Sequence, residues 1–328
     1  MPTNLPSNYF KIEERYRQAN SPQEKIACVE EMLSVVPKHK GTDKLRGDLR
    51  RRLSELKEVS KKKKGVARQV SVFQIEREGA GQVVVVGMPN VGKSALVDAL
   101  TNATPEVADY PFTTWTPTPG MMHVDDIQVQ LIDTPPLNEE HVEPEMINLI
   151  RRADLILLVV DVQAHPIQQI EDAAAFLKEQ RIVPRHHSER YLDEPGMLFI
   201  PFLVLVNKVD DETWDEDFEV LQELLGEEWP LVPVSATTGR YFDRLKWAVF
   251  KELSVMRLYS KPPNKEPDLD APFVMEAGST VEEFAAKVHK DFLANLKSAR
   301  VWGSAEFDGQ MVGRDYVLQD GDVVELRM

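Results

Sequence analysis

Residues 82–101, which read QVVVVGMPNVGKSALVDALT, constrain the fold more than any other segment. A β-branched apolar run ends at Gly87, and GMPNVGKS then fits the pattern G-x-x-x-x-G-K-[ST] ahead of an apolar-periodic helix. The glycines let such a loop curl, so that its main-chain N–H groups and the helix N-terminus hold phosphates. We therefore expect Lys93 to contact the β- and γ-phosphates of a nucleotide and Ser94 to bind Mg²⁺. The alternative is a glycine loop that fits the pattern by chance.

Four further apolar runs follow, namely IQVQLID, ADLILLVVD, FLVLVNK and LVPVSA. Helical stretches separate most of them, and this alternation predicts an α/β domain with a doubly wound, mostly parallel sheet. We place this P-loop domain at residues 80–260. The proline-rich stretch at 262–272 is typical of a linker. Residues 270–328 mix short strands with one helix, which we expect to begin with a capping box of Ser279 and Glu282.

Residues 1–70 are expected to form a basic helical hairpin. The segment SPQE at 21–24 resembles a capping box, and leucines form a narrow apolar stripe at positions 45, 49, 53 and 56. Residues 38–68 carry thirteen Lys or Arg against four Asp or Glu, a local charge of +9 on a chain of net charge −15. Two interpretations remain open, a solvated helical face or contact with the phosphates of ribosomal or other structured RNA, and we prefer the second.

The tetrapeptide NKVD at 207–210 points to the base, because it ends a strand where a base-reading loop belongs. The carboxylate of Asp210 can accept hydrogen bonds from guanine N1 and N2, whereas adenine N1 is itself an acceptor. We expect Asn207 to brace the loop and the Lys208 stem to cover the base. The tripeptide SAT at 235–237 would supply the N–H of Ala236 to guanine O6. These residues favour GTP and argue against an ATPase.

These motifs make the chain resemble the Obg-like GTPases, most closely the DRG (developmentally regulated GTP-binding) type. The resemblance covers nearly the whole chain and includes PKHKGTDKLRGDLRRRLSELK, GMPNVGKS, ADYPFTTWTPTPG, NKVD, SAT and the C-terminal VHKDF and ARVWGSAEFDGQMVGRDYVLQDGDVVEL. It implies a G domain, a β-grasp TGS domain at the C-terminus, and association with ribosomes or RNA. DRG-type proteins usually carry a further domain inserted in the G domain, for which this chain has no room.

The resemblance also implies a Mg²⁺-binding threonine in YPFTT and a Mg²⁺-water aspartate at Asp133. We choose Thr114 before Thr113; the alternative is that both serve an ordinary strand. Asn90 matches an asparagine that ligates K⁺ in potassium-activated relatives, or else it only shapes the loop. We expect catalytic roles for Lys93, Thr114 and Asp133, and metal ligands at Ser94, Thr114 and Asp133. The nucleotide-binding residues are expected to be Gly87, Pro89, Asn90, Val91, Gly92, Lys93, Ser94, Ala95, Asn207, Lys208, Asp210, Ser235, Ala236 and Thr237.

One departure from the pattern concerns the second switch, LIDTPPLNEE at 131–140. GTP-hydrolysing proteins usually read D-x-x-G here, and the glycine N–H contacts the γ-phosphate. Pro136 occupies that position and has no N–H, and the loss of one hydrogen bond to a charged group costs roughly 1.5–3 kcal/mol. Leu137 stands where many GTPases carry a water-orienting glutamine. Two functions follow, a slow Mg²⁺-dependent GTPase or a non-hydrolysing guanine-nucleotide-binding scaffold or RNA-binding module.

Other features carry less weight. No apolar run approaches the roughly 20 residues needed to cross a bilayer, and the first residues form no signal-peptide core, so we expect a cytoplasmic protein without a membrane partner. Cys28, the single cysteine, lies on an apolar helix face and is expected in the core. His186 and His187 are adjacent but lack an evident third metal ligand, so a polar surface loop is the preferred interpretation.

Overall fold

The computed structural model describes residues 12, 15–16, 22–36, 47, 49, 51–53, 73, 75–101, 117–137 and 143–328. They belong to two compact units, residues 1–72 and 73–328, which are described separately. Thr113, Thr114 and the lysine run at 61–64 lie outside the described residues.

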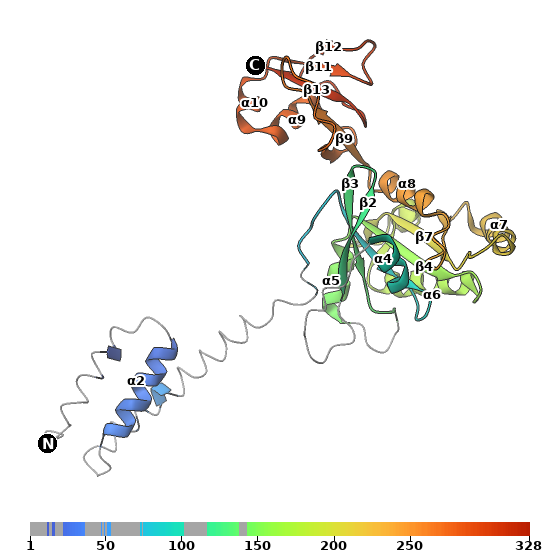
Figure 1. Ribbon diagram of the computed structural model, residues 1–328. Helices are drawn as coiled ribbons and strands as arrows, with labels where there is room; N and C mark the ends of the chain where they lie inside the picture. Colours follow the sequence, from blue (N-terminus) through green and yellow to red (C-terminus); the bar gives the residue numbers. More distant parts are fainter. Residues whose placement is uncertain are drawn as a thin grey trace. The chain divides into compact units, whose positions relative to one another are not determined.

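The described part of the first unit is helical and centres on α2 (Pro22–Val35) (Figure 1). Cys28, Val29 and Met32 of α2 are buried in one cluster. Leu49 is buried in the same cluster and Leu53 packs against it, and both belong to the second helical stretch. Cys28 is therefore a core residue, as predicted, and the contact of Leu49 with the cluster fits the expected hairpin over these residues.

The first sheet of the second unit has the strand order β2-β3-β1-β4-β7-β8. Its pairs are parallel except for the antiparallel hairpin of β2 and β3. The strands are β1 (Gln82–Val86), β2 (Thr118–Val124), β3 (Ile127–Asp133), β4 (Leu155–Asp161), β7 (Phe202–Asn207) and β8 (Leu231–Pro233). The sequence predicted all of these except β2, whose glycine, proline and histidine weaken its strand pattern.

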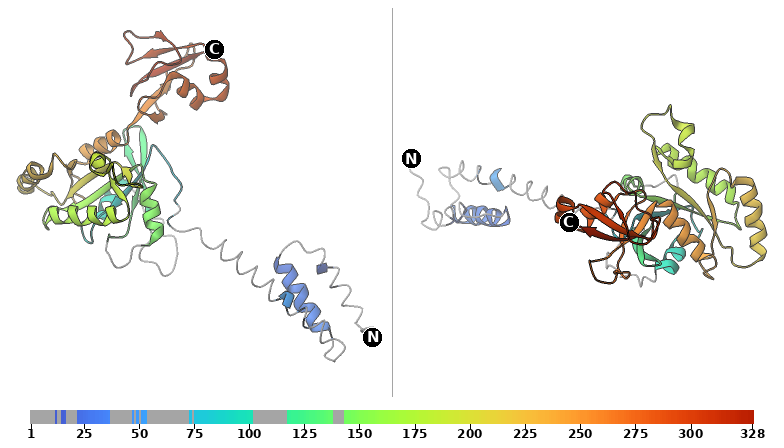
Figure 2. Two further views of the ribbon diagram at one scale, coloured as in Figure 1. Left: turned by 180° about the vertical axis from the view of Figure 1, so that it is seen from behind. Right: turned by 90° about the horizontal axis from the view of Figure 1, so that it is seen from above.

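Both faces of this sheet are buried, since Val84 and Val86 of β1 belong to one core cluster and Val83 and Val85 to another. The first cluster includes α5 (Pro144–Arg151), α6 (Pro166–Glu179) and α7 (Thr213–Leu225), and the second includes α4 (Lys93–Thr101) and α8 (Phe242–Glu252). Helices on both faces (Figures 1 and 2) make this the doubly wound α/β domain that the sequence predicted. The carboxyl ends of β1, β3, β7 and β8 therefore lead to one edge of the sheet.

A small element follows α6 and consists of β5 (Ile182–Pro184), the 3₁₀ helix η1 (Arg185–Tyr191) and β6 (Leu198–Ile200). The expectation of a polar surface loop was wrong for His187, which is buried against Trp229 and contacts the Glu228 carbonyl at 3.0 Å. Within the described ranges, no three His, Cys, Asp or Glu side chains gather as metal ligands. None of the described helices is both long and apolar enough to span a bilayer.

A second sheet, in the order β10-β9-β13-β11-β12, makes up the C-terminal domain. Its elements are β9 (Val255–Ser260), β10 (Phe273–Glu276), α9 (Val281–Val288), α10 (Lys290–Asn295), β11 (Ser298–Trp302), β12 (Gln310–Val312) and β13 (Val323–Arg327). Phe284 and Ala285 of α9 are buried in the same cluster as side chains of β9, β11 and β13. The packing of α9 on a mixed sheet is the expected β-grasp arrangement.

Two expectations for this domain need correction. The sequence predicts a G domain at 80–260, but β9 pairs with β10 and β13, so the C-terminal domain begins near Val255. The proline-rich stretch is the β9–β10 connection inside that domain rather than a linker before it. The capping box is formed by Thr280 and Glu283, one residue later than predicted, because the Ser279 hydroxyl instead donates to the Glu276 carbonyl.

Candidate functional site

The phosphate loop connects β1 to α4, and close contacts at two positions require glycine. A Cβ on Gly92, where φ is +92°, would lie 2.4 Å from Nδ2 of Asn207, and a Cβ on Gly87 would lie 2.4 Å from the Val159 carbonyl oxygen. Pro89 and Asn90 are exposed at the tip of the loop, whereas Val91 is buried below it. Ala95 lies exposed in the first turn of α4. The glycines thus let the loop pack against β4 and the end of β7.

Lys93 is buried and bends back over the loop. Its Nζ donates to the carbonyl oxygens of Gly87 at 3.0 Å and Met88 at 2.8 Å. Burial lowers the pKa of Lys93 to about 8, although the nearby charge of Asp133 acts in the opposite direction. The charge of Asp133 offsets only part of the cost of burying the Lys93 ammonium. Such a site is suited to bind an anion such as a nucleotide phosphate.

Ser94 and Asp133 meet at the expected metal position. The Ser94 hydroxyl donates to Oδ2 of Asp133 at 2.5 Å, and Oδ1 of Asp133 is buried without a hydrogen-bond partner among the described residues. Burial raises the pKa of Asp133, outweighing the hydrogen bond from Ser94 and the charge of Lys93. A carboxylate oxygen without a partner beside a serine hydroxyl fits a hard cation such as Mg²⁺. The third expected ligand, Thr114, lies outside the described residues.

Asn207 connects the phosphate loop to the loop after β8. Its Nδ2 donates to the Val91 carbonyl at 2.8 Å, and its Oδ1 accepts the Ala236 N–H at 3.1 Å. The residue is only 1% exposed. The sequence predicted a bracing role for Asn207, and the structure adds that its partners come from two other motifs. A single buried amide therefore fixes the position of the phosphate loop relative to the SAT loop.

The base-reading residues also lie together. Oδ1 of Asp210 accepts the Ser235 hydroxyl at 2.6 Å, and the Ser235 hydroxyl oxygen in turn accepts the Thr238 N–H at 3.0 Å. Lys208 forms an ion pair with Asp161 at the end of β4. No motif marks Asp161, although it ends a predicted strand. Thr237 is exposed at the edge of this group. The structure thus brings NKVD and SAT together at the same sheet edge as the phosphate loop.

The first residues of the second switch are packed against the phosphate loop. The Thr134 hydroxyl donates to the Val85 carbonyl at 2.7 Å, and the Leu137 N–H donates to the Gly87 carbonyl at 3.1 Å. The Leu137 side chain is 2% exposed and belongs to the sheet core. Pro135 and Pro136 have no N–H. From residue 135 to residue 137, the main chain therefore has no free N–H group for a phosphate.

Comparisons with known proteins agree with this geometry. The family model described as 50S ribosome-binding GTPase matches residues 82–189, and the TGS domain model matches residues 256–328. An uncharacterized GTP-binding protein of Methanocaldococcus jannaschii is 31% identical over 93% of this chain and 92% of its own length. Developmentally-regulated G-protein 2 of Arabidopsis thaliana is 27% identical over 92% of this chain and 90% of its own. Developmentally-regulated GTP-binding protein 1 of Xenopus laevis is 26% identical over 92% and 98%.

A structural neighbour supports the fold. The YchF GTPase of Schizosaccharomyces pombe superposes with a TM-score of 0.54 at 14% identity, covering 77% of this chain and 99% of that one.

The alignment with the Methanocaldococcus protein runs over 366 positions, more than the 328 residues of this chain, so the relative carries residues that this chain lacks.

The fold and the site together define a P-loop GTP-binding protein with a C-terminal TGS domain. The chain belongs to the family of DRG-type GTP-binding proteins.

Proposed function

We propose that this GTP-binding protein hydrolyses GTP slowly with Mg²⁺, couples its second switch only weakly to the γ-phosphate, and acts in the cytoplasm on ribosomes or structured RNA. The single observation that carries the nucleotide assignment is the position of Asn207, whose buried amide connects the phosphate loop to the SAT loop. Lys93 would contact the phosphates, Asp210 and Ala236 would read guanine, and Ser94 and Asp133 would hold Mg²⁺. Bound Mg²⁺ would neutralise charge on the phosphate oxygens.

Slow hydrolysis follows from the second switch. Leu137 occupies the position of the water-orienting glutamine, and its side chain lies in the core. Its N–H donates to the Gly87 carbonyl. Neither group is free to orient a water or to contact the γ-phosphate in this conformation. We expect a rate within the range of unassisted GTPases, on the order of 10⁻⁴ to 10⁻² per second. The same observation favours the second candidate, a guanine-nucleotide-binding scaffold that does not hydrolyse GTP.

Nucleotide choice is tested by competition titration of the full-length protein with GTP, GDP, ATP and XTP. GTP and GDP should bind much more tightly than ATP, because adenine offers Asp210 no donors at N1 and C2. Asp210→Asn should lose the preference for guanine and gain xanthine, while Asp211→Asn, on the neighbouring exposed residue, should change neither. Equal affinities for ATP and GTP would refute the guanine assignment.

Hydrolysis is tested by single turnover of GTP in Na⁺ and in K⁺. Pro136→Gly supplies an N–H at the γ-phosphate position and should shift preference toward GTP over GDP by up to roughly 1.5–3 kcal/mol. Pro135→Ala is the matched control, because it restores an N–H one residue earlier. An unchanged rate and preference in Pro136→Gly would show that the switch argument is wrong. Faster hydrolysis in K⁺ would support Asn90 as a cation ligand, and equal rates would restrict it to shaping the loop.

RNA or ribosome binding is supported by the charge of residues 38–68, which carry +9 on a chain of net charge −15. The acidic remainder repels RNA, so contact should be local to this arm, with help from the TGS domain. Each neutralised phosphate contributes about −0.7 to −0.9 to the log–log salt slope, and five contacts would give roughly −4.

Sedimentation with ribosomes over a salt series tests this arm. Glutamine at Arg50, Arg51, Arg52 and residues 61–64 should flatten the slope and spare GTP affinity. Glutamine at exposed lysines and arginines of the G domain, outside both the arm and the TGS domain, is the control and should leave the slope steep (Lys178, Arg181, Arg185, Arg244 and Lys251). Equal slopes for the wild type and the arm variant would assign the charge run to solvation.

A further inference from the structure

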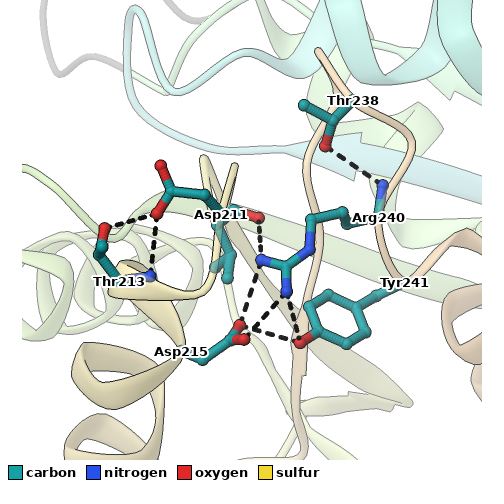
Figure 3. A network of polar contacts seen from close by, with 7 residues as sticks. Asp211, Thr213, Asp215, Thr238, Arg240 and Tyr241 are labelled. Carbon is teal, nitrogen blue, oxygen red and sulfur yellow. Dashed lines mark hydrogen bonds and ion pairs between the residues drawn. The ribbon is translucent and has the colours of Figure 1, made fainter.

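Arg240 lies in the loop between β8 and α8, and its side chain reaches toward the NKVD loop (Figure 3). Its Nη2 donates to Oδ2 of Asp215 at 3.0 Å, and its Nη1 donates to the Val209 carbonyl over a longer 3.4 Å. The Arg240 side chain is 27% exposed. Asp215 lies in the first turn of α7, which begins directly after the NKVD loop. One arginine side chain therefore joins the NKVD loop to the helix that follows it.

The main chain of Arg240 closes the other base-reading loop. Its carbonyl accepts the Ser235 N–H at 3.3 Å, and the Gly239 N–H donates to the Ser235 carbonyl at 2.9 Å. Ser235 also holds Asp210 through its hydroxyl. The backbone of Arg240 thus shapes the SAT loop, while its side chain contacts the residue before Asp210.

Tyr241 completes the network. Its hydroxyl donates to Oδ1 of Asp215 at 2.9 Å, and its ring lies 5.0 Å from the guanidinium carbon of Arg240. The hydrogen bond with Asp215 raises the pKa of Tyr241, so the hydroxyl keeps its proton and remains a donor. Asp215 therefore receives donors from two neighbouring side chains, which limits the positions that Arg240 can adopt.

We propose that Arg240 is a positioning residue that sets the guanine specificity of this site. The proposal rests on the assignment of Asp210 and Ala236 as the base contacts. Guanine recognition needs the Asp210 carboxylate and the Ala236 N–H at a fixed separation. Arg240 forms hydrogen bonds with the residue that precedes each of them in the chain, which is Val209 before Asp210 and Ser235 before Ala236. Among the described contacts of Arg240, none reaches the phosphate loop. Its loss should therefore change discrimination between bases more than the overall grip on the phosphates.

The test is calorimetric titration of the full-length protein with GDP and with IDP in the presence of Mg²⁺. Hypoxanthine lacks the 2-amino group of guanine. The dissociation constant for IDP divided by that for GDP therefore reports the hydrogen bond from the 2-amino group to Asp210. Arg240→Met keeps the length of the stem and should lower this ratio about fivefold or more, a part of the effect of one hydrogen bond to a charged group. Arg240→Lys keeps the charge for Asp215 but not the second donor, and should give an intermediate ratio.

Arg190→Met is the matched control, since Arg190 lies in η1, its guanidinium also pairs with a carboxylate, that of Glu228 at 3.1 Å, and none of its described contacts involves the NKVD or SAT loop. It should leave the ratio unchanged. The proposal is overturned if Arg240→Met weakens GDP and IDP equally, or lowers only thermal stability, because either result describes a merely structural residue. If the methionine variant does not fold, an unchanged ratio in Arg240→Lys overturns it. A wild-type protein that binds both nucleotides equally contradicts the Asp210 assignment itself, and the proposal falls with it.

Discussion

Replacing Lys93 by methionine should stabilise the nucleotide-free protein and abolish nucleotide binding. Lys93 is 6% exposed, and the only described hydrogen-bond partners of its ammonium are two main-chain carbonyls of the phosphate loop. Its pKa falls from 10.5 to about 8, mainly through burial. At about 1.36 kcal/mol per pKa unit, holding the charge in the folded state costs roughly 3 kcal/mol. Methionine has a similar length and no charge, so the expected gain is about 1–3 kcal/mol after the lost hydrogen bonds.

The gain should depend on pH with a defined sign. The folded pKa of Lys93 lies below the unfolded value, so the cost is complete below pH 8 and disappears as the folded lysine loses its proton between pH 8 and pH 10.5. The advantage of Lys93→Met should therefore shrink over this window.

Urea unfolding of the full-length protein without nucleotide, at neutral pH and across that window, measures this difference. Lys251→Met, on the exposed side of α8, is the control and should show no such pH dependence. A variant less stable than wild type at neutral pH, or a difference that does not change with pH, would refute the reasoning.

Two further predictions concern the contacts between motifs and between domains. Asn207→Ala should lower the free energy of unfolding by about 2–4 kcal/mol and weaken GDP binding more than tenfold, because the carbonyl of Val91 and the N–H of Ala236 lose their partner. The exposed Asn148→Ala is its control, and equal GDP affinities for the two variants would contradict the role of Asn207. Arg257→Met should lower the free energy of unfolding by about 1–2 kcal/mol, because β9 then loses a guanidinium paired with three carboxylates. The control, Arg327→Met, should lower it by less. The three carboxylates belong to Asp125 and Asp126 in the β2–β3 turn and to Asp320; equal unfolding midpoints would show that this network adds nothing.

The parts of the fold that could be predicted are those determined by a local pattern of consecutive residues. The strand, glycine loop and helix around Lys93 specify their own geometry, and the buried parallel strands read as unbroken apolar runs. β2 was missed because its apolar residues are few and its pairing with β3 is a tertiary preference. The domain boundary was misplaced because proline-rich composition marks a loop without telling whether that loop lies between domains or between two strands of one sheet.

The site was predicted as a set of motifs, and the contacts between them were not. That Pro136 lacks an N–H is visible in the sequence, but the use of the Leu137 N–H by Gly87 depends on how the two loops pack. Arg240 carries no motif, and its role depends on Asp215, which lies 25 residues away in the sequence. Interactions of this kind depend on tertiary packing and have no local periodicity to reveal them.

Amide hydrogen exchange over Thr134–Leu137 tests most directly the claim that the second switch has no main-chain donor for the nucleotide. Pro135 and Pro136 carry no amide hydrogen, so only the amides of Thr134 and Leu137 report from this segment. We predict that the Leu137 amide is protected without nucleotide, through its hydrogen bond to the Gly87 carbonyl, and equally protected with GDP and with a non-hydrolysable GTP analogue. A Leu137 amide that exchanges freely in the GDP state and becomes protected only with the GTP analogue would contradict it.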